Sequence, residues 1–261
     1  MKFQMIGKEM WDMSKIPPGI QLYTLRNELE EDFTGTMKKV ADMGYKTIEF
    51  AGYYDIPSTQ MRRLLNELGL VAISSHVDID KLKSDLQGEI NYALDIGVKY
   101  IVVPIIPKET FLNSNKFNQL VSLFIEISDE LRRHGLNFVY HNHGHEFEKI
   151  NGKFILDHLL ERVGEARLAL ELDVYWIKKV GLDPIKVLQY YRRNVPLLHV
   201  KDIDQEGETT EVGEGLIYWP KVFQIARNIG VKFYFVEQDI SRHPVKSAKK
   251  SLDYLKSIGL V

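Results

Sequence analysis

The chain has no cysteine among its 261 residues. That absence excludes disulfide bonds, thiolate ligands for a metal and a cysteine nucleophile. A chain of this length buries enough surface to fold without disulfides, and the lack of cysteine fits a reducing compartment. Any metal site must therefore use oxygen and nitrogen donors.

Concentrated positive charge is also missing, because 36 acidic residues balance 34 basic ones and no long run of lysine or arginine occurs. Nucleic acids and anionic membranes both require such a surface, so we expect neither as a partner. No apolar run is long enough to span a bilayer, and residues 1–15 lack the unbroken apolar stretch of a signal peptide. We therefore expect a soluble cytoplasmic protein that binds a small molecule.

The chain also lacks the G-x-G-x-x-G signature of dinucleotide-binding sheets and any proline- or serine-rich linker. What it has is a repeating pattern, in which a short run rich in Val, Ile, Tyr and Phe precedes a longer segment with helical spacing. The runs are apolar nearly throughout, as in parallel strands buried on both faces. They cover residues 20–23, 47–50, 71–75, 100–106, 137–141, 169–172, 197–200 and 234–236.

Most of the intervening segments end near a glycine, which adopts the left-handed backbone of a helix C-cap at little cost. The predicted helices cover residues 31–43, 58–68, 83–96, 115–134, 184–193 and 218–229. Strand ends recur about every 30 residues, the length of one βα unit in a barrel. Eight such units predict a single (β/α)8 TIM barrel, an α/β fold, over residues 16–261, with residues 1–15 as an N-terminal arm. Such barrels often pair, although no patch in the sequence identifies an interface for a homodimer.

Polar residues follow four neighbouring strands where each strand ends, at the barrel face that carries active sites. They are His141, Asp173, His199 and Glu237. Adjacent strands lie ~4.8 Å apart, so these side chains can converge on one ion. Carboxylate and imidazole donors suit Mn²⁺, Co²⁺, Mg²⁺ or Zn²⁺, and the pattern therefore predicts a divalent metal site. His143 shares a face with His141 and is an alternative ligand or a base.

Further polar residues at the strand ends are candidates for binding substrate or stabilising charge. We expect His76, Glu49 and His145 to contact substrate. Lys201 can bind an anionic group or a developing negative charge, unless a salt bridge to a neighbouring acid occupies it. Glu171 is expected to support the metal ligands from behind. A purely structural polar network is the alternative for the whole set.

Several motifs resemble those of the xylose isomerase-like sugar phosphate isomerase/epimerase superfamily, which includes ketose 3-epimerases, inosose dehydratases and, more distantly, endonuclease IV. The resemblance covers nearly the whole chain. It rests on GIQLYTLR at 19–26, YHNH at 140–143, ELDVYW at 171–176, HVKD at 199–202, VGEG at 212–215 and VEQD at 236–239. HVKD and VEQD resemble the inosose dehydratase branch in particular.

The resemblance implies an enzyme with a divalent metal at the ends of strands five to eight, where Asp173, His199 and Glu237 match the family's ligands. It further implies proton abstraction next to a carbonyl of a small keto-sugar or polyol, with Glu237, His143 and Lys201 as catalytic groups. The epimerases have glutamate where this chain has His141, which weakens a two-base epimerisation. Isomerisation, dehydration as in inosose dehydratase, and lysis of a keto-glycoside therefore stay open.

Two other functions are weighed against this enzyme. A phosphodiesterase like endonuclease IV needs more metal ligands and a basic DNA-binding face, which the balanced charge disfavours. A sugar-binding barrel without catalysis is disfavoured by the intact set of acids and imidazoles.

Overall fold

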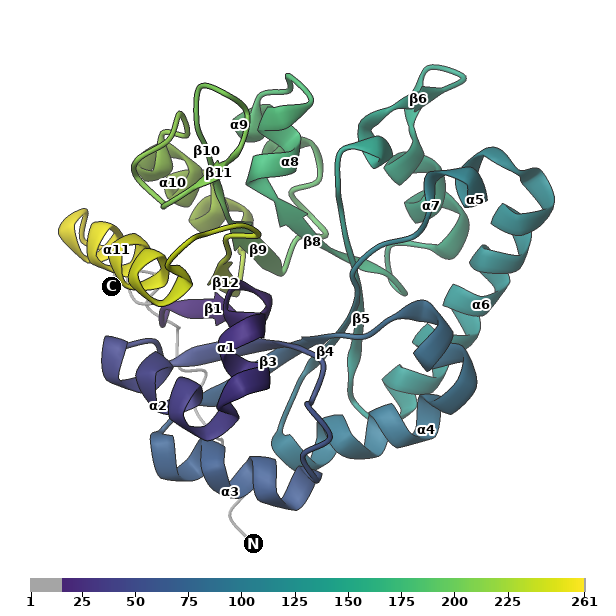
Figure 1. The fold of residues 1–261 in the computed structure, drawn as a ribbon. Coiled ribbons are helices and arrows are strands. Elements are labelled where there is room, and N and C mark those ends of the chain that lie inside the picture. Colours follow the sequence, from purple (N-terminus) through teal and green to yellow (C-terminus); the bar gives the residue numbers. More distant parts are fainter. Residues whose placement is uncertain (1–15, 261) are drawn as a thin grey trace, which may run out of the picture.

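Eight parallel strands close into a barrel in the computed structural model, which describes residues 16–260 (Figure 1). The predicted arm, residues 1–15, lies outside the described part of the chain. Around the barrel the strands are β1 (Gly19–Gln21), β2 (Thr47–Ala51), β3 (Val71–His76), β4 (Tyr100–Val103), β5 (Asn137–His141), β8 (Ala169–Asp173), β9 (Leu197–Val200) and β12 (Phe233–Val236). β1 pairs with both β2 and β12, which closes the barrel. All eight predicted strands and the TIM barrel fold are confirmed.

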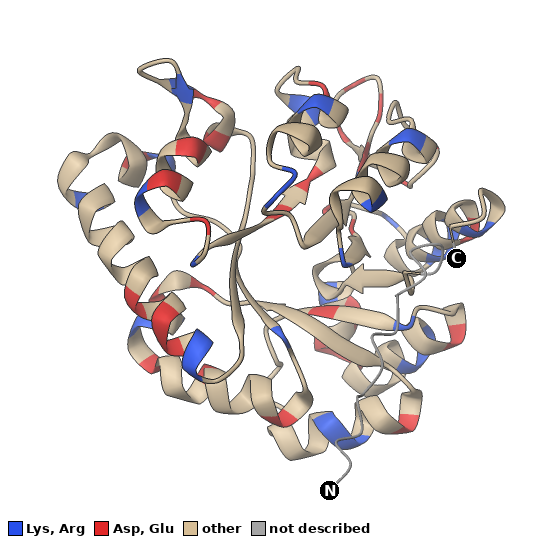
Figure 2. Ribbon diagram, turned by 180° about the vertical axis from the view of Figure 1, so that it is seen from behind, with Lys and Arg blue, Asp and Glu red and all other residues tan. Residues whose placement is uncertain are grey.

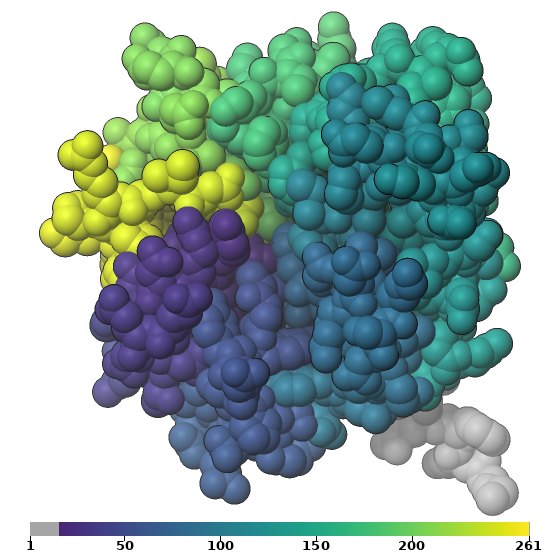
Figure 3. Space-filling view, turned by 45° about the vertical axis from the view of Figure 1, so that its right-hand side comes forward, coloured from purple at the N-terminus to yellow at the C-terminus, as the bar shows by residue number. Residues whose placement is uncertain are grey.

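Helices form the outer ring, and α11 from the end of the chain lies beside α2 from its beginning (Figures 1 and 3). The helices are α1 (Arg26–Glu31), α2 (Phe33–Met43), α3 (Ser58–Leu68), α4 (Ile79–Ile96), α5 (Lys108–Leu112), α6 (Ser114–Arg133), α7 (Ile155–Val163), α8 (Val174–Lys179), α9 (Pro184–Tyr190), α10 (Trp219–Ile229) and α11 (Pro244–Ser257). Short 3-10 turns cover Leu22–Leu25 and His145–Phe147. Two small hairpins are formed by β6 (Lys149–Ile150) with β7 (Lys153–Phe154), and by β10 (Asp202–Ile203) with β11 (Thr209–Thr210).

Several predicted boundaries differ from the observed ones for local reasons. The first strand ends at Gln21 rather than residue 23, because the Gln21 side chain accepts a hydrogen bond from the Tyr23 N–H and starts a 3-10 turn. The fourth strand ends at Val103 rather than residue 106, since Pro104 has no N–H for the ladder. The helix predicted from residue 31 is broken at Asp32, whose carboxylate caps α2 by accepting from the Gly35 N–H.

The interior of the barrel has an apolar layer toward the amino ends of the strands. This lower interior cluster consists of Ile73, Val102, Val139, Leu197 and Phe235, all at most 5% exposed. A separate and larger core fills the space between the strands and the helices. The lower interior cluster fills the barrel interior toward the amino ends of the strands, and the polar side chains of the next layer pack against it.

The outer surface carries interspersed charges, with basic and acidic residues alternating over the helices seen in Figure 2. None of the helices within residues 16–260 combines the length and apolar character that a bilayer crossing requires.

Candidate metal centre

The alternation of strand residues places polar groups directly above the lower interior cluster. On β9 and β12, Leu197 and Phe235 point into the barrel, and the next inward positions are His199 and Glu237, two residues further on. His141 follows Val139 on β5 in the same way. All three polar side chains are at most 5% exposed. The strand period thus brings side chains of separate strands to one buried centre.

Asp173, His199 and Glu237 each offer one donor atom, and these atoms lie within 4.8 Å of one another. The His199 Nδ1 is 2.9 Å from the Glu237 Oε2. The His141 Nε2 lies 3.8 Å from the Asp173 Oδ2. The four side chains predicted as metal ligands are therefore close together at the carboxyl ends of β5, β8, β9 and β12.

The Asp173 carboxylate has one oxygen engaged and one available. Its Oδ1 accepts hydrogen bonds from the N–H groups of Tyr175 and Trp176 and so caps α8. Its Oδ2 is buried and accepts no hydrogen bond, although the Lys201 Nζ lies 3.1 Å away. A buried carboxylate oxygen without a hydrogen bond, facing imidazole and carboxylate donors, fits a divalent cation.

Two acids, Glu171 and Glu49, contact the histidine ring nitrogens that face away from the centre. The Glu171 Oε2 lies 3.1 Å from the His141 Nδ1 and 3.1 Å from the His199 Nε2. The Glu49 Oε2 lies 2.6 Å from the same His199 nitrogen and accepts from the Gln21 amide at 2.8 Å. Because the rear nitrogens are engaged, the His141 Nε2 and the His199 Nδ1 face the centre, as in metal sites whose ligating histidines donate to a carboxylate.

His76, on β3, contacts the same two acids. Its Nε2 is 2.8 Å from the Glu171 Oε2 and 3.3 Å from the Glu49 Oε2, and its ring stacks on His199 with centroids 5.4 Å apart. Burial disfavours the charged ring, but Glu49 and Glu171 outweigh it and raise the pKa of His76 to about 9. The predicted substrate residues His76 and Glu49 thus lie in the cluster, in contact with a predicted ligand.

Lys201 lies in the gap between the carboxylates. Its Nζ is 2.6 Å from the Glu237 Oε2, 3.1 Å from the Asp173 Oδ2 and 2.9 Å from the Asp239 Oδ1. Burial opposes the ammonium charge, yet these three acids raise the pKa of Lys201 well above its usual value. Burial also opposes the Glu237 carboxylate, but Lys201 and His199 hold the pKa of Glu237 well below its usual range. The ammonium therefore lies among three carboxylates that stabilise its positive charge.

The two remaining predicted histidines lie at the edge of the centre. The His143 ring is 5.2 Å from the His141 ring and 5.0 Å from the Trp176 ring. Burial and the nearby Lys201 lower the pKa of His143 to about 3, so its ring is neutral. His145 points away, since its Nε2 lies 3.0 Å from the Ile106 carbonyl and 3.1 Å from the Glu146 carboxylate. The two rings line a shared cavity of about 630 Å³ beside the centre.

Two features of this region were not apparent in the sequence. Asp239, which completes the acid set around Lys201, lies in a loop after β12 and carried no signal beyond the VEQD motif. Asp202, the acid that follows Lys201 in the sequence, is not one of its partners and accepts hydrogen bonds from the Trp219 indole and the Gly213 N–H. The VGEG segment packs against this carboxylate, since a Cβ on Gly215 would lie 2.3 Å from the Asp202 Oδ1. The VGEG segment is therefore part of a loop that the Asp202 carboxylate holds in place.

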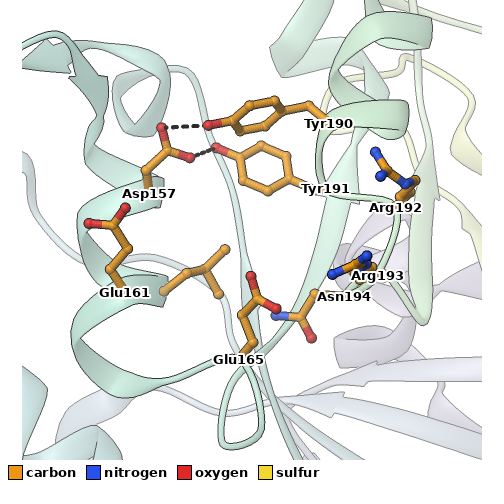
Figure 4. A pocket seen from close by; sticks show the side chains of 9 residues that line it. Asp157, Glu161, Glu165, Tyr190, Tyr191, Arg192, Arg193 and Asn194 are labelled. Atoms are coloured by element: carbon orange, nitrogen blue, oxygen red, sulfur yellow. Dashed lines mark hydrogen bonds between the residues drawn. The ribbon is translucent and has the colours of Figure 1, made fainter.

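A hollow of about 320 Å³ lies apart from these donors, between α7 and the loop after α9 (Figure 4). Its most buried acid is Asp157, whose carboxylate accepts from the Tyr191 hydroxyl at 2.7 Å and the Phe154 N–H at 3.0 Å. Tyr190 points at the same group (Figure 4). These bonds join α7 to α9, and the arrangement is that of a structural contact.

Most of the chain is similar to known proteins with several different names. A curated inosose dehydratase of Bacillus thuringiensis (strain Al Hakam) is 21% identical over 269 aligned positions, which cover 87% of this chain and 90% of that protein. The solved structure of a sugar phosphate isomerase/epimerase from Parabacteroides distasonis ATCC 8503 has a TM-score of 0.84 and 26% identity, and the match covers 95% of this chain and 100% of that one.

A second similar structure is described as IOLI protein with a binding zinc atom. It is 15% identical with a TM-score of 0.71, and the match covers 93% of this chain and 99% of that one, so the likeness is one of fold. The family described as xylose isomerase-like TIM barrel matches residues 37–258. Because the match spans most of the chain and the fold agrees, the protein belongs to the xylose isomerase-like TIM barrel family.

Proposed function

We propose that this chain is a divalent-metal-dependent enzyme that removes a proton next to the carbonyl of a small keto-sugar or polyol, as sugar phosphate isomerases and epimerases do. The observation that carries the proposal is the convergence of His141, Asp173, His199 and Glu237 around the Asp173 Oδ2, a buried oxygen that accepts no hydrogen bond. Mn²⁺, Co²⁺, Mg²⁺ and Zn²⁺ are all compatible with these donors.

A bound divalent ion would polarise the carbonyl and a neighbouring hydroxyl, which acidifies the adjacent C–H bond. The residues of the chain supply the other parts of the reaction. Glu237, or His143 with its neutral ring, takes the proton. Lys201 would stabilise negative charge that develops on the carbonyl oxygen once a bound ion replaces it as the partner of Asp173 and Glu237, because its ammonium is paired with these acids in the metal-free chain. His76 and Glu49 hold the rings of the centre in place, and His76 reaches the adjoining cleft where substrate enters.

The fate of the carbanion separates the possible reactions. Reprotonation at a neighbouring carbon gives isomerisation, and reprotonation from the opposite face gives epimerisation. Loss of a β-hydroxyl gives dehydration. Dehydration is the second candidate function. It is supported by the similarity to inosose dehydratases over most of the chain and by the HVKD and VEQD motifs. The histidine at position 141, in place of a glutamate, also favours reactions that need one base rather than two.

Solvent-deuterium exchange followed by NMR tests the proposal. The purified chain with Mn²⁺ is incubated in D₂O with keto-sugars, inososes and 3-keto-glycosides. We expect deuterium to enter next to the carbonyl of at least one compound, and Asp173→Asn to abolish the exchange. Asp253→Asn, on the exposed face of α11, is the matched control and should exchange at the wild-type rate. If no compound exchanges, or if Asp173→Asn exchanges normally, the proposal is wrong.

The remote alternative, phosphodiester hydrolysis as in endonuclease IV, is tested with abasic DNA under the same metal conditions. We expect no cleavage, because the balanced charge provides no concentrated basic surface for the duplex.

A further inference from the structure

A cleft of about 770 Å³ opens beside the metal centre, at the carboxyl ends of β2, β3 and β4. His76 lines its inner end, and the His76 ring lies 5.1 Å from the His141 ring and 5.4 Å from the His199 ring. A volume of this size encloses a drug-sized ligand, which is much larger than one sugar ring. None of the four predicted ligands is among the described residues that line the cleft, so a substrate that reacts at the centre would reach the cleft past His76.

Aromatic side chains form much of the cleft wall. Tyr53 and Tyr92 stack with ring centroids 3.8 Å apart, and the Tyr92 hydroxyl donates to the Ile56 carbonyl at 2.7 Å. Tyr23, which is 43% exposed, and Tyr54 also line the cleft. Tyr53 and Tyr92 each cover one face of the other, and the Arg26 guanidinium lies 4.2 Å from the Tyr23 ring centroid, so each of these rings offers a sugar or aryl ring its remaining face at most.

The loop that presents these rings has a strained backbone. Tyr54 and Asp55 follow β2 with φ angles of 53° and 54°, in the left-handed region that non-glycine residues rarely adopt. Such conformations persist where the surrounding structure enforces them, and they cluster at ligand sites. The strain is consistent with a loop shaped for binding.

The charges around the cleft are unsuited to an anion. Four acids line it, namely Asp55, Asp78, Asp85 and Glu89. Lys81 is the single lysine or arginine among the described lining residues, and its Nζ is already 3.2 Å from the Asp85 carboxylate and 3.9 Å from the Glu89 carboxylate. A phosphate in this cleft would meet net negative charge, and the other cationic side chain of the lining, His76, is already paired with Glu49 and Glu171.

Given the proposed function, we infer that the substrate is a glycoside: a keto-sugar whose second, uncharged ring, a sugar or an aryl group, binds in the tyrosine-lined cleft. The reacting sugar lies at the metal centre, and the second ring stacks on the tyrosines beyond His76. A sugar phosphate, in contrast, gains nothing from the cleft.

Calorimetric titration of the full chain with Mn²⁺ tests this inference with three ligands: 3-keto-glucose, its phenyl glycoside and its 6-phosphate. We expect the phenyl glycoside to bind roughly tenfold more tightly than the free sugar, since ring stacking contributes up to a factor of about ten. The phosphate should bind no more tightly than the free sugar. Equal affinities for glycoside and free sugar, or tightest binding of the phosphate, would overturn the inference.

Two variants locate the effect. Tyr23→Ala and Tyr54→Leu should each reduce the preference for the phenyl glycoside while the affinity for the free sugar stays the same. Tyr218→Ala, at a tyrosine that is 73% exposed and outside the cleft, is the matched control and should keep the preference. A glycoside preference that both cleft variants retain places the second ring elsewhere and contradicts the inference.

The two experiments distinguish a failure of the cleft assignment from a failure of the proposed function. A preference for the glycoside without deuterium exchange in any compound would refute the proposed reaction and leave the cleft assignment standing. Exchange with the free keto-sugar, without any preference for the glycoside, would refute the cleft assignment alone.

Discussion

The two ends of the barrel interior are built from the same strands but have opposite chemistry. Toward the amino ends, Leu197, Phe235 and Val139 pack in an apolar layer with almost no exposed surface. One inward position further along the same strands, His199, Glu237 and His141 form a charged centre that is equally buried. The backbone is the same in both layers, so the difference lies entirely in the side chains.

Under the proposed function, the residues that stabilise the barrel and those that bind the ion are separated along its axis. The apolar layer gains free energy from burial and packing. The charged layer costs free energy because carboxylates and imidazoles leave water, and neighbouring charges compensate for only part of that cost. Substitutions at the two ends should therefore have different consequences, and the predictions below test that difference.

The largest effect is expected from Asp173→Asn in the upper layer. The asparagine keeps an oxygen for the α8 cap but removes the negative donor from the centre. We expect deuterium exchange to fall by about 10²–10⁴-fold. The unfolding free energy of the metal-free protein should stay the same or rise, because a buried charge is removed. Urea denaturation measures it, and a clear loss of stability would mean that the upper layer also holds the fold together.

Leu197→Ala in the lower interior cluster should have the opposite effect: it should lower the unfolding free energy and leave the response to Mn²⁺ intact. Leu197 is fully buried, so its truncation leaves a cavity that costs about 2–5 kcal/mol of unfolding free energy. Mn²⁺ should still raise the melting temperature of this variant, since it removes no donor. A variant that loses its response to Mn²⁺ while it keeps its stability would break the proposed separation.

The pH dependence of stability sharpens the contrast, because burial raises the pKa of Asp173 to about 6 from the ordinary value of 3.8. A carboxyl whose pKa is raised by folding stabilises the folded state below its unfolded pKa, and that contribution is lost as the pH rises through about 6. Between about pH 4 and pH 7, the metal-free wild type should lose roughly 1–3 kcal/mol relative to Asp173→Asn. Leu197→Ala should follow the wild-type pH profile, and parallel profiles for all three proteins would contradict the assignment.

The smallest effect concerns the acids behind the histidines. Glu171→Gln leaves all four predicted ligands in place but weakens the acceptor that orients His141 and His199. We expect Mn²⁺ affinity, measured by calorimetry, to fall by about 10–100-fold. Glu161→Gln on the surface of α7 is the control and should bind Mn²⁺ as the wild type does. An unchanged affinity in Glu171→Gln would show that the rings are held by packing alone.

Much of the fold and of the candidate site could be predicted from the sequence, because short stretches of the chain carry the strongest signals. An uninterrupted apolar run identified each strand, and a polar residue at the end of such a run is unusual enough to mark Asp173, His199 and Glu237 as a group. The barrel then followed from the number and spacing of the runs.

The rest depends on contacts between strands, which local patterns do not determine. Glu171 and Asp173 share one face of β8, so the alternation of strand residues alone does not say which acid faces the centre, and it was the resemblance to the family that assigned Asp173 to the metal and left Glu171 as support. Lys201 precedes Asp202, but adjacent strand residues point in opposite directions, and the partners of Lys201 come from neighbouring strands. The helix α8 was not predicted because it is only six residues long and is capped by Asp173 itself.

The ammonium of Lys201 bears on the order in which the protein folds and acquires an ion. Asp173, Glu237 and the partly exposed Asp239 would repel one another, yet Lys201 already lies within about 3 Å of each and serves as their counter-ion. Small zinc domains lack such a substitute and are unfolded without their metal. Under the proposed function, a newly synthesised chain can instead complete its barrel before an ion binds, and a chelating agent should abolish the proposed activity without unfolding the chain.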